Sequence, residues 1–189
     1  MTGAALSTAG IAVRDAAEGD FDAIAEIYAR YVRCGTASFE IEPPGADTLI
    51  ERWRGVLAAG LPYLIAETGG SVAGFAYATL YRPRRAYRFT VEHSIYVRQG
   101  NVRRGVGGAL IEPLIERCAA LGYRQMLAVI GDSANAASIG FHKRHGFRHA
   151  GTLPSVGYKF DRWVDSVLMI RPLGDGDASP PQGHPPYSR

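Results

Sequence analysis

The chain has 189 residues, of which 47% are hydrophobic and 21% are charged, and its formal net charge at pH 7 is +3. This is the composition of an ordinary globular domain with enough chain to bury a core. No apolar run reaches membrane-spanning length, and the arginines form two short groups rather than a long basic block. We therefore expect neither a membrane protein nor a nucleic-acid-binding protein.

The N-terminus and the two cysteines bear on the cellular compartment. Residues 1–10 are small and polar and lack the basic and apolar segments of a secretory signal, so we expect a flexible N-terminus. Cys34 and Cys118 have no metal-ligand spacing and fall in apolar helical patterns. That placement favours reduced thiols in or near the core of a cytoplasmic protein with no metal site.

The first third of the chain predicts one strand and two helices. Residues 11–14 alternate as a short strand, and Asp20 can cap the helix that follows. The apolar stripe of this helix consists of Ile24, Ile27, Tyr28 and Tyr31. After a Pro-Pro-Gly break, a second helix is expected from Asp47. Its inward-facing residues are expected to be Ile50, Trp53 and Leu57.

The middle of the chain predicts three strands. Residues 63–67 and 72–81 are strand-like, and the two adjacent glycines between them are typical of a hairpin. A basic aromatic loop follows at 82–89, and the third strand passes through residues 95–97.

The last third predicts two helices and three strands. From Val106 to Gly122 the hydrophobic period is helical, although Pro113 should kink this helix or leave a carbonyl unpaired. The remaining expected elements are a strand at 125–130, a helix from about Asn135 to Gly146, and strands at 156–160 and 163–170.

This order of elements predicts one α/β domain at residues 11–173, in which a mixed sheet carries helices on both faces. From Gly174 onward the chain is rich in glycine, proline, serine and aspartate. Residues 174–189 are therefore expected to form a disordered tail.

The strongest chemical signal is a glycine-rich run between a strand and a helix. It consists of Arg103, Arg104, Gly105, Val106, Gly107 and Gly108. The glycines let a ligand approach the main chain, and the free N–H groups of a helix start attract an anion such as a pyrophosphate. Taken alone the motif is weak, because a helix can also begin with flexible residues.

A second signal follows the next strand. Asn135 and Ser138 open a short helix that includes His142 and ends at Gly146. Asn135 can cap this helix or contact a ligand, and both interpretations stay open. The two runs, with a strand between them, resemble the GCN5-related N-acetyltransferase (GNAT) superfamily over about residues 11–173.

The resemblance implies the GNAT acyl-CoA N-acyltransferase fold, with a mostly antiparallel sheet, and acetyl-CoA as co-substrate. The glycine-rich run would hold the coenzyme A pyrophosphate, and Asn135 and Ser138 would contact the cofactor. The main chain of Ile95 and Val97 would bind the acetyl-pantetheine arm and stabilise the oxyanion.

A narrower likeness, to the phosphinothricin and methionine sulfoximine acetyltransferases, rests on co-linear runs along the chain. These runs are Phe39-Glu40, Gly74–Ala78, Tyr81–Tyr87, Thr90–Val97, Ala128–Gly131 and parts of Gly151–Asp165. Two departures stand out. Val102 replaces the usual Gln or Arg, so Arg103 or Arg104 would substitute for it, and Pro113 is unusual in its helix.

The same resemblance places catalysis on Glu92 and His142. Amines are largely protonated at neutral pH, so acyl transfer needs a base, and Glu92 can serve from the strand beside the cleft. The pattern alone equally fits a solvated charge at a strand edge. His142 stands where an acid would protonate the departing thiolate, and a structural histidine is the alternative.

The basic aromatic loop is expected to select the acceptor. Arg82 and Arg84 could grip a carboxylate or phosphinate, while Phe39 and Tyr87 could wall the site. We expect acetyl transfer from acetyl-CoA to the amine of a small amino-acid analogue, by a homodimer as the resemblance implies. Acetylation of another small amine or of a protein N-terminus, and a non-catalytic coenzyme A sensor, stay open as alternatives.

Overall fold

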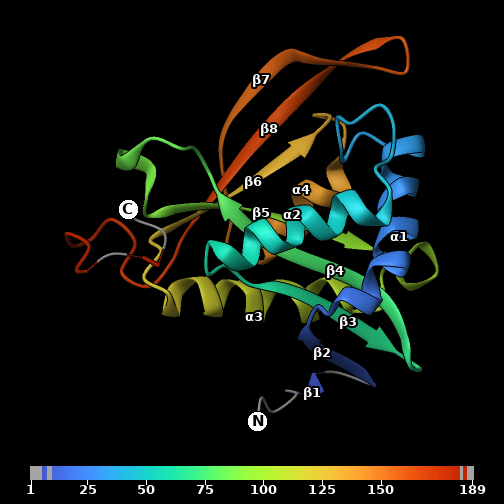
Figure 1. Ribbon diagram of the computed structural model, residues 1–189. Coiled ribbons are helices and arrows are strands. Elements are labelled where there is room, and N and C mark those ends of the chain that lie inside the picture. The colour runs from blue at the N-terminus through green and yellow to red at the C-terminus, as the bar shows by residue number, and fades with distance from the viewer. Residues whose placement is uncertain (1–5, 8–9, 184, 187–189) are drawn as a thin grey trace.

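The computed structural model describes residues 6–7, 10–183 and 185–186, which form one eight-stranded sheet covered by helices (Figure 1). The strands are β1 (Leu6–Ser7), β2 (Ile11–Asp15), β3 (Tyr63–Thr68), β4 (Ser71–Leu80), β5 (Thr90–Val97), β6 (Gln125–Gly131), β7 (Arg148–Lys159) and β8 (Arg162–Pro172). They lie in the order β1-β2-β3-β4-β5-β6-β8-β7. Every neighbouring pair is antiparallel except β5 and β6, which are parallel, so the predicted mixed sheet is confirmed.

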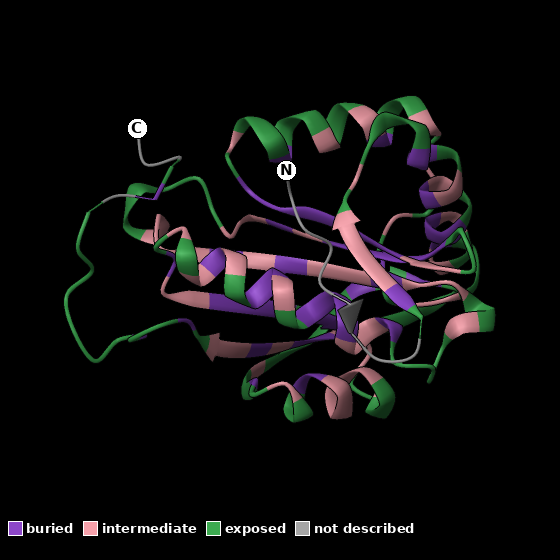
Figure 2. Ribbon diagram, turned by 90° about the horizontal axis from the view of Figure 1, so that it is seen from below, coloured by how far each residue is buried: buried purple, intermediate pink, exposed green. Residues whose placement is uncertain are grey.

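The helices cover both faces of this sheet (Figure 2). They are α1 (Phe21–Cys34), α2 (Ala46–Ala58), α3 (Val106–Ala120) and α4 (Ala136–Arg144). α1 and α2 pack on one face, and α3 and α4 on the other. Side chains of β4 alternate accordingly. A Cβ on Gly74 would lie 3.0 Å from Val106 of α3, whereas Phe75 packs against Tyr96 on the α1 side.

An aromatic layer joins α1 and α2 to the sheet. The Phe21 ring lies 5.2 Å from that of Trp53 and 5.8 Å from that of Tyr63, measured between centroids. Tyr63 stacks on Tyr77 at 4.8 Å and on Phe75 at 6.0 Å. Large rings bury much apolar area and gain from tilted or offset contacts. The layer therefore holds β3 and β4 firmly under the two helices.

The buried helix faces differ from the predicted ones in two places. In α2 the expected Ile50 and Trp53 are partly buried and pack against the core, next to the buried Leu49 and Val56, but Leu57 is 47% exposed and falls outside the buried face. Cys118 is buried as expected, but Cys34 is exposed at the end of α1. Hydrophobic spacing alone did not distinguish adjacent faces of these helices.

The first residues of the C-terminal segment contact the domain. Arg124 donates to the Gly176 carbonyl at 2.8 Å and to the Ser179 carbonyl at 2.9 Å. Leu173, at the start of the segment, is buried. These contacts place residues 174–179 in turns against the domain, while disorder of the tail at 174–189 stays a prediction.

Part of the expected flexible N-terminus, residues 1–5 and 8–9, lies outside the described residues. Residues 6–7 form β1, which pairs with β2. Among the helices in the described residues, none combines the length and apolar character needed to cross a bilayer.

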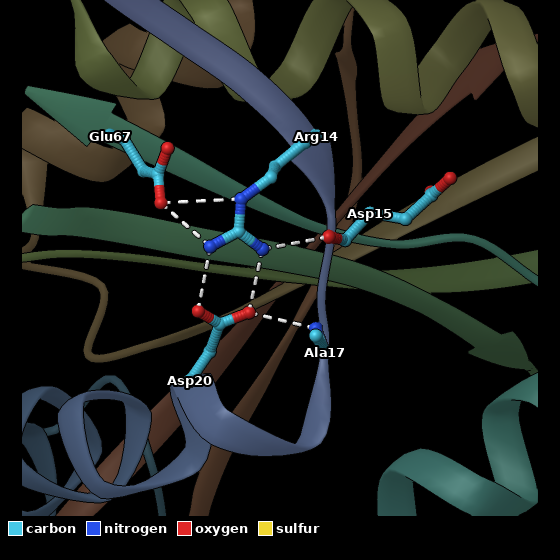
Figure 3. Close-up of polar contacts among 5 residues, drawn as sticks. All are labelled: Arg14, Asp15, Ala17, Asp20 and Glu67. Atoms are coloured by element: carbon cyan, nitrogen blue, oxygen red, sulfur yellow. Dashed lines mark hydrogen bonds and ion pairs between the residues drawn. The ribbon is translucent and has the colours of Figure 1, made fainter. Parts of the chain in front are cut away.

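A charged cluster fixes the entry to α1 (Figure 3). Arg14 of β2 makes two hydrogen bonds of 2.8 Å to the Asp20 carboxylate and two, of 2.6 and 3.2 Å, to Glu67 of β3. Asp20 also accepts from the Ala17 N–H at 2.7 Å. Burial opposes ionisation of Asp20, but these bonds outweigh it, so the pKa of Asp20 is lowered.

We expect Asp20→Asn to lower the free energy of unfolding at pH 7 by about 1–2 kcal/mol, because Arg14 loses its bidentate partner at a partly exposed site. The native pKa of Asp20 lies below its unfolded value of about 3.9. Its contribution is therefore present above that value and is lost as the pH falls through the native pKa. Urea unfolding at pH 7 and pH 3 measures both effects.

The matched control is Glu18→Gln, which breaks the exposed pair between Arg54 and Glu18. That variant should leave stability nearly unchanged. Equal losses in the two variants would contradict a special role for the Arg14 cluster.

Candidate active site

A cleft opens where β5 and β6 stop pairing. The two parallel strands pair as far as His93 and Ala128, and both then run on without pairing to each other. The resulting cleft has a volume of ≈ 270 Å³ and is completed by α4 and by the loop after α1. Six of the sequence-predicted residues line it: Phe39, Glu92, Ile95, Asn135, Ser138 and His142.

The main chain of β5 faces the cleft at one residue. Arg98 donates its N–H to the Ala73 carbonyl of β4. The N–H and carbonyl of Val97 point away from β4, and both bond to the Tyr31 hydroxyl, at 3.2 and 2.7 Å. Because the main-chain direction alternates from one residue of a strand to the next, Ile95 points the same way as Val97. Its N–H and carbonyl therefore face the cleft. Ile95 can thus bind a ligand as expected, whereas the main chain of Val97 is bound by Tyr31 instead.

Glu92 is a partly buried carboxylate in the wall of the cleft. Its removal from water raises its pKa, and no opposite charge among the described residues offsets that effect. A carboxylate with a raised pKa is a stronger proton acceptor near neutral pH. The site therefore contains a group suited to take a proton from an amine.

His142 is buried beside the cleft, and both of its ring nitrogens have partners. Nδ1 lies 2.8 Å from the Ser138 carbonyl, and Nε2 lies 3.2 Å from Nε2 of His93. A carbonyl only accepts, so Nδ1 of His142 carries the proton and Nε2 of the neutral ring is an acceptor. His93 then donates from its Nε2, which leaves its buried Nδ1 without a hydrogen-bond partner.

This pairing bears on the expected acid role. Burial lowers the pKa of His142 and lowers that of His93 to about 3, so both rings are neutral at pH 7. Neutral His142 has no N–H left to give to a leaving group in the cleft. The geometry thus favours the structural alternative for His142.

The glycine-rich run forms an anion-binding helix start. Arg103 and Gly105 adopt left-handed φ angles of 64° and 86°, which turn the chain into α3. Ala109 N–H makes the first bond back, to the Gly105 carbonyl, and the N–H groups of residues 106–108 have no main-chain acceptor among the described residues. Those groups favour a negative charge. α3 runs from Val106 to Ala120 with Pro113 inside it, and because proline has no N–H the helix lacks one main-chain hydrogen bond there, one of the two expected effects.

Helix packing and capping also use the predicted residues. A Cβ on Gly107 would lie 3.1 Å from the Phe141 ring, so this glycine also allows α3 and α4 to approach each other. Asn135 caps α4 by accepting the Ser138 N–H at 3.1 Å. Each residue therefore has a structural role in addition to its expected ligand contact.

The expected acceptor residues lie in two separate places. Phe39 lines the cleft, but Arg82 and Arg84 lie on an exposed loop that does not line it. The Arg82 guanidinium lies 5.1 Å from the Tyr81 ring centroid and 5.9 Å from that of Tyr87. Within one chain, Phe39 therefore lies at the cleft, and the loop that carries Arg82 and Arg84 does not.

Sequence reasoning missed several residues of the site, among them Tyr31, Thr36 and His93. Tyr31 was assigned only to an apolar stripe, and the position of its hydroxyl could not be read from that pattern. His93 follows Glu92 directly, so a second titratable residue on this strand was a usable signal. Within the described residues, no group of three His, Cys, Asp or Glu side chains could hold a metal ion.

Comparison with known proteins places this geometry in a family. Residues 22–147 match the Acetyltransferase (GNAT) family. The chain belongs to the GNAT acetyltransferase family. It is 50% identical to a phosphinothricin N-acetyltransferase of Alcaligenes faecalis, over 95% of this chain and 91% of that protein. It is 42% identical to an L-methionine sulfoximine/L-methionine sulfone acetyltransferase of Pseudomonas paraeruginosa, over 83% of this chain and 91% of the relative.

A solved structure agrees with this assignment. The crystal structure of a GNAT superfamily phosphinothricin acetyltransferase from Sinorhizobium meliloti, in complex with acetyl-CoA, superposes with a TM-score of 0.90 at 41% identity. The match covers 95% of this chain and 98% of that one. The GNAT fold and the expected kinship with both groups of acetyltransferases are therefore confirmed.

If the start of α3 holds the pyrophosphate of this acetyltransferase's co-substrate, Gly107→Val should weaken acetyl-CoA binding at least about ten-fold. Titration calorimetry measures the affinity, and circular dichroism checks the fold. Because the new side chain also meets Phe141, the variant is repeated together with Phe141→Leu. Recovery of binding in the double variant would show that helix packing, rather than ligand approach, requires the glycine.

Proposed function

We propose that this GNAT enzyme transfers the acetyl group of acetyl-CoA to the amine of a small amino-acid analogue of the phosphinothricin or methionine sulfoximine type. The observation that carries the proposal is Glu92, a carboxylate of raised pKa in the cleft between the diverging strands. The relatives named for those two acceptors support the substrate class.

The residues present fit acetyl-CoA. The free N–H groups at the start of α3 would hold its pyrophosphate, with exposed Arg103 and Arg104 adding positive charge. The Ile95 main chain would bind the pantetheine arm, and Asn135 and Ser138 would line its path. Acetyl-CoA supplies an activated thioester when it is bound.

Glu92 then accepts the proton that the amine must lose in order to attack. Its raised pKa brings the carboxylate closer to the pKa of the amine than an exposed glutamate would be. The Ile95 N–H donates to the oxygen on which negative charge develops. We do not assign protonation of the thiolate to His142, because its neutral ring has no free N–H.

Acceptor recognition is assigned to Phe39 in the cleft. Arg82, Arg84 and Tyr87 lie on a loop that does not line the cleft of one chain, so their assigned part in recognition depends on the homodimer proposed below. Guanidinium groups bind carboxylate and phosphinate oxygens through paired N–H donors. Arg84 is exposed and forms no ion pair within the described part of the chain, so its donors are available to a ligand.

The proposal includes a homodimer in the cytoplasm. The hairpin of β7 and β8 exposes a group of large apolar side chains: Val156, Tyr158, Phe160 and Trp163. Each of them is more than half exposed, and Ile41 is 67% exposed. Clustered apolar surface of this kind favours protein association.

Replacing Glu92 by glutamine keeps its shape but removes the proton acceptor. We expect the maximal rate of Glu92→Gln near neutral pH to fall by roughly 10²–10⁴-fold, the usual contribution of a general base. Acetyl-CoA affinity should barely change, because its contacts are assigned to other residues. Wild-type activity should decline as the pH falls through the raised pKa of Glu92, and higher pH should partly rescue the variant because more amine is neutral.

Glu42→Gln, on an exposed loop, is the matched control and should keep the full rate. Rates are measured with acetyl-CoA and a panel of amino-acid analogues, simple amines and peptide N-termini. A near-wild-type rate for Glu92→Gln would remove Glu92 from the mechanism. Acetyl-CoA binding without turnover of any acceptor would favour the sensor alternative.

Acceptor recognition by Arg84 is tested separately. Arg84→Ala should raise the KM for an amino-acid acceptor by an amount equivalent to about 1.5–3 kcal/mol, the value of a charged hydrogen bond. An amine without a carboxylate should be almost unaffected. Equal losses on both acceptors would indicate a structural arginine.

A further inference from the structure

Lys159 is a buried cation whose partners lie far away in the sequence. It ends β7, is 4% exposed, and donates from Nζ to the Ser38 carbonyl at 2.6 Å and to the Gly35 carbonyl at 2.9 Å. Burying an ammonium group costs free energy unless hydrogen bonds compensate. The chain has only one other lysine, Lys143, which is exposed on α4. The burial of Lys159 thus calls for a specific reason.

The loop that Lys159 holds also packs directly against two strand backbones. A Cβ on Gly157 of β7 would lie 2.4 Å from the Phe39 ring. A Cβ on Gly131 of β6 would lie 1.8 Å from the Thr36 carbonyl oxygen and 2.8 Å from the same ring. The Thr36 hydroxyl donates to the Gly131 carbonyl at 3.3 Å. Figure 1 shows this loop, between α1 and α2, beside the end of β6.

We propose that Lys159 is a positioning residue that fixes the Gly35–Phe39 segment as the acceptor wall of the cleft. The inference rests on the proposed function, because this segment contributes Thr36, Ala37 and Phe39 to the cleft. Lys159 binds two main-chain carbonyls of the segment. The segment itself, through the Phe39 ring and the Thr36 carbonyl, packs against Gly157 and Gly131. The groups assigned to acetyl-CoA belong to other elements, so loss of Lys159 acts on the acceptor.

Two physical effects make the segment depend on this lysine. The loop has no strand partner, so its carbonyls at residues 35 and 38 obtain their compensation from the ammonium group. The Phe39 ring keeps its place only while the main chain on either side is fixed, because the ring is still 39% exposed. Removing the Lys159 ammonium group therefore makes the Gly35–Phe39 segment more mobile and displaces the acceptor wall that it forms.

The test is Lys159→Met, which keeps the length of the side chain and removes its donors. We expect the KM for the acceptor to rise by about ten-fold or more, with acetyl-CoA affinity within about two-fold of wild type. Hydrogen exchange of residues 35–41, followed by mass spectrometry, should become faster than in the wild type. Lys143→Met is the matched control and should change none of these quantities.

A second pair of variants keeps the inference testable if Lys159→Met fails to fold. Gly157→Ala places a methyl group against the Phe39 ring without removing any charge, and it should also raise the acceptor KM. In a Phe39→Ala background, Gly157→Ala should add no further effect, since the ring it would displace is gone. An undiminished effect in that background would overturn the proposal.

The hydrogen-exchange measurement needs no substrate, so it separates this inference from the proposed function. If the wild type acetylates no amino-acid analogue, the proposed function fails, and exchange in residues 35–41 still decides whether Lys159 fixes the segment. Unchanged exchange in Lys159→Met would overturn the inference. So would a loss confined to kcat and acetyl-CoA affinity with an unaltered acceptor KM.

Discussion

The site depends on the point at which β5 and β6 stop pairing. Strand edges carry N–H and carbonyl groups that must find partners, and an unpaired edge inside a protein is costly. Here the main-chain groups of β5 beyond His93, where pairing with β6 ends, meet two different situations. The Tyr31 hydroxyl satisfies both main-chain groups of Val97, while Ile95 faces the cleft. The opening in the sheet thus provides a polar groove in which a ligand can supply the missing hydrogen bonds.

Burial around this groove affects adjacent residues of β5 in opposite directions. Loss of water disfavours whichever form is charged, so it raises the pKa of Glu92 and lowers that of His93. His142 is kept neutral for the same reason. One physical cause therefore raises the pKa of the Glu92 carboxyl and makes the two histidines a neutral hydrogen-bonded pair.

The supports of the cleft come from elements distant in the sequence. The aromatic layer fixes α1 and α2 on the sheet, and the Arg14 cluster ties the start of α1 to β2 and β3. Lys159 reaches from β7 to the loop that leaves α1. The wall that contains Phe39 is consequently held at both ends, by the helix before it and by the hairpin across the cleft.

The sequence by itself determined the order of elements, the mixed sheet, the glycine-rich start of α3 and the family, because strand alternation, helix punctuation and local motifs are all encoded within a few residues. It also identified Glu92, Ile95 and Phe39, which the fold brings to one cleft. Only the tertiary structure decided that Leu57 of α2 is exposed, that Tyr31 engages Val97, and that His93 uses the remaining nitrogen of His142. It also decided that Arg124 donates to the main chain at Gly176 and Ser179. These features depend on contacts between residues far apart in the chain, where local propensity carries no information about the partner.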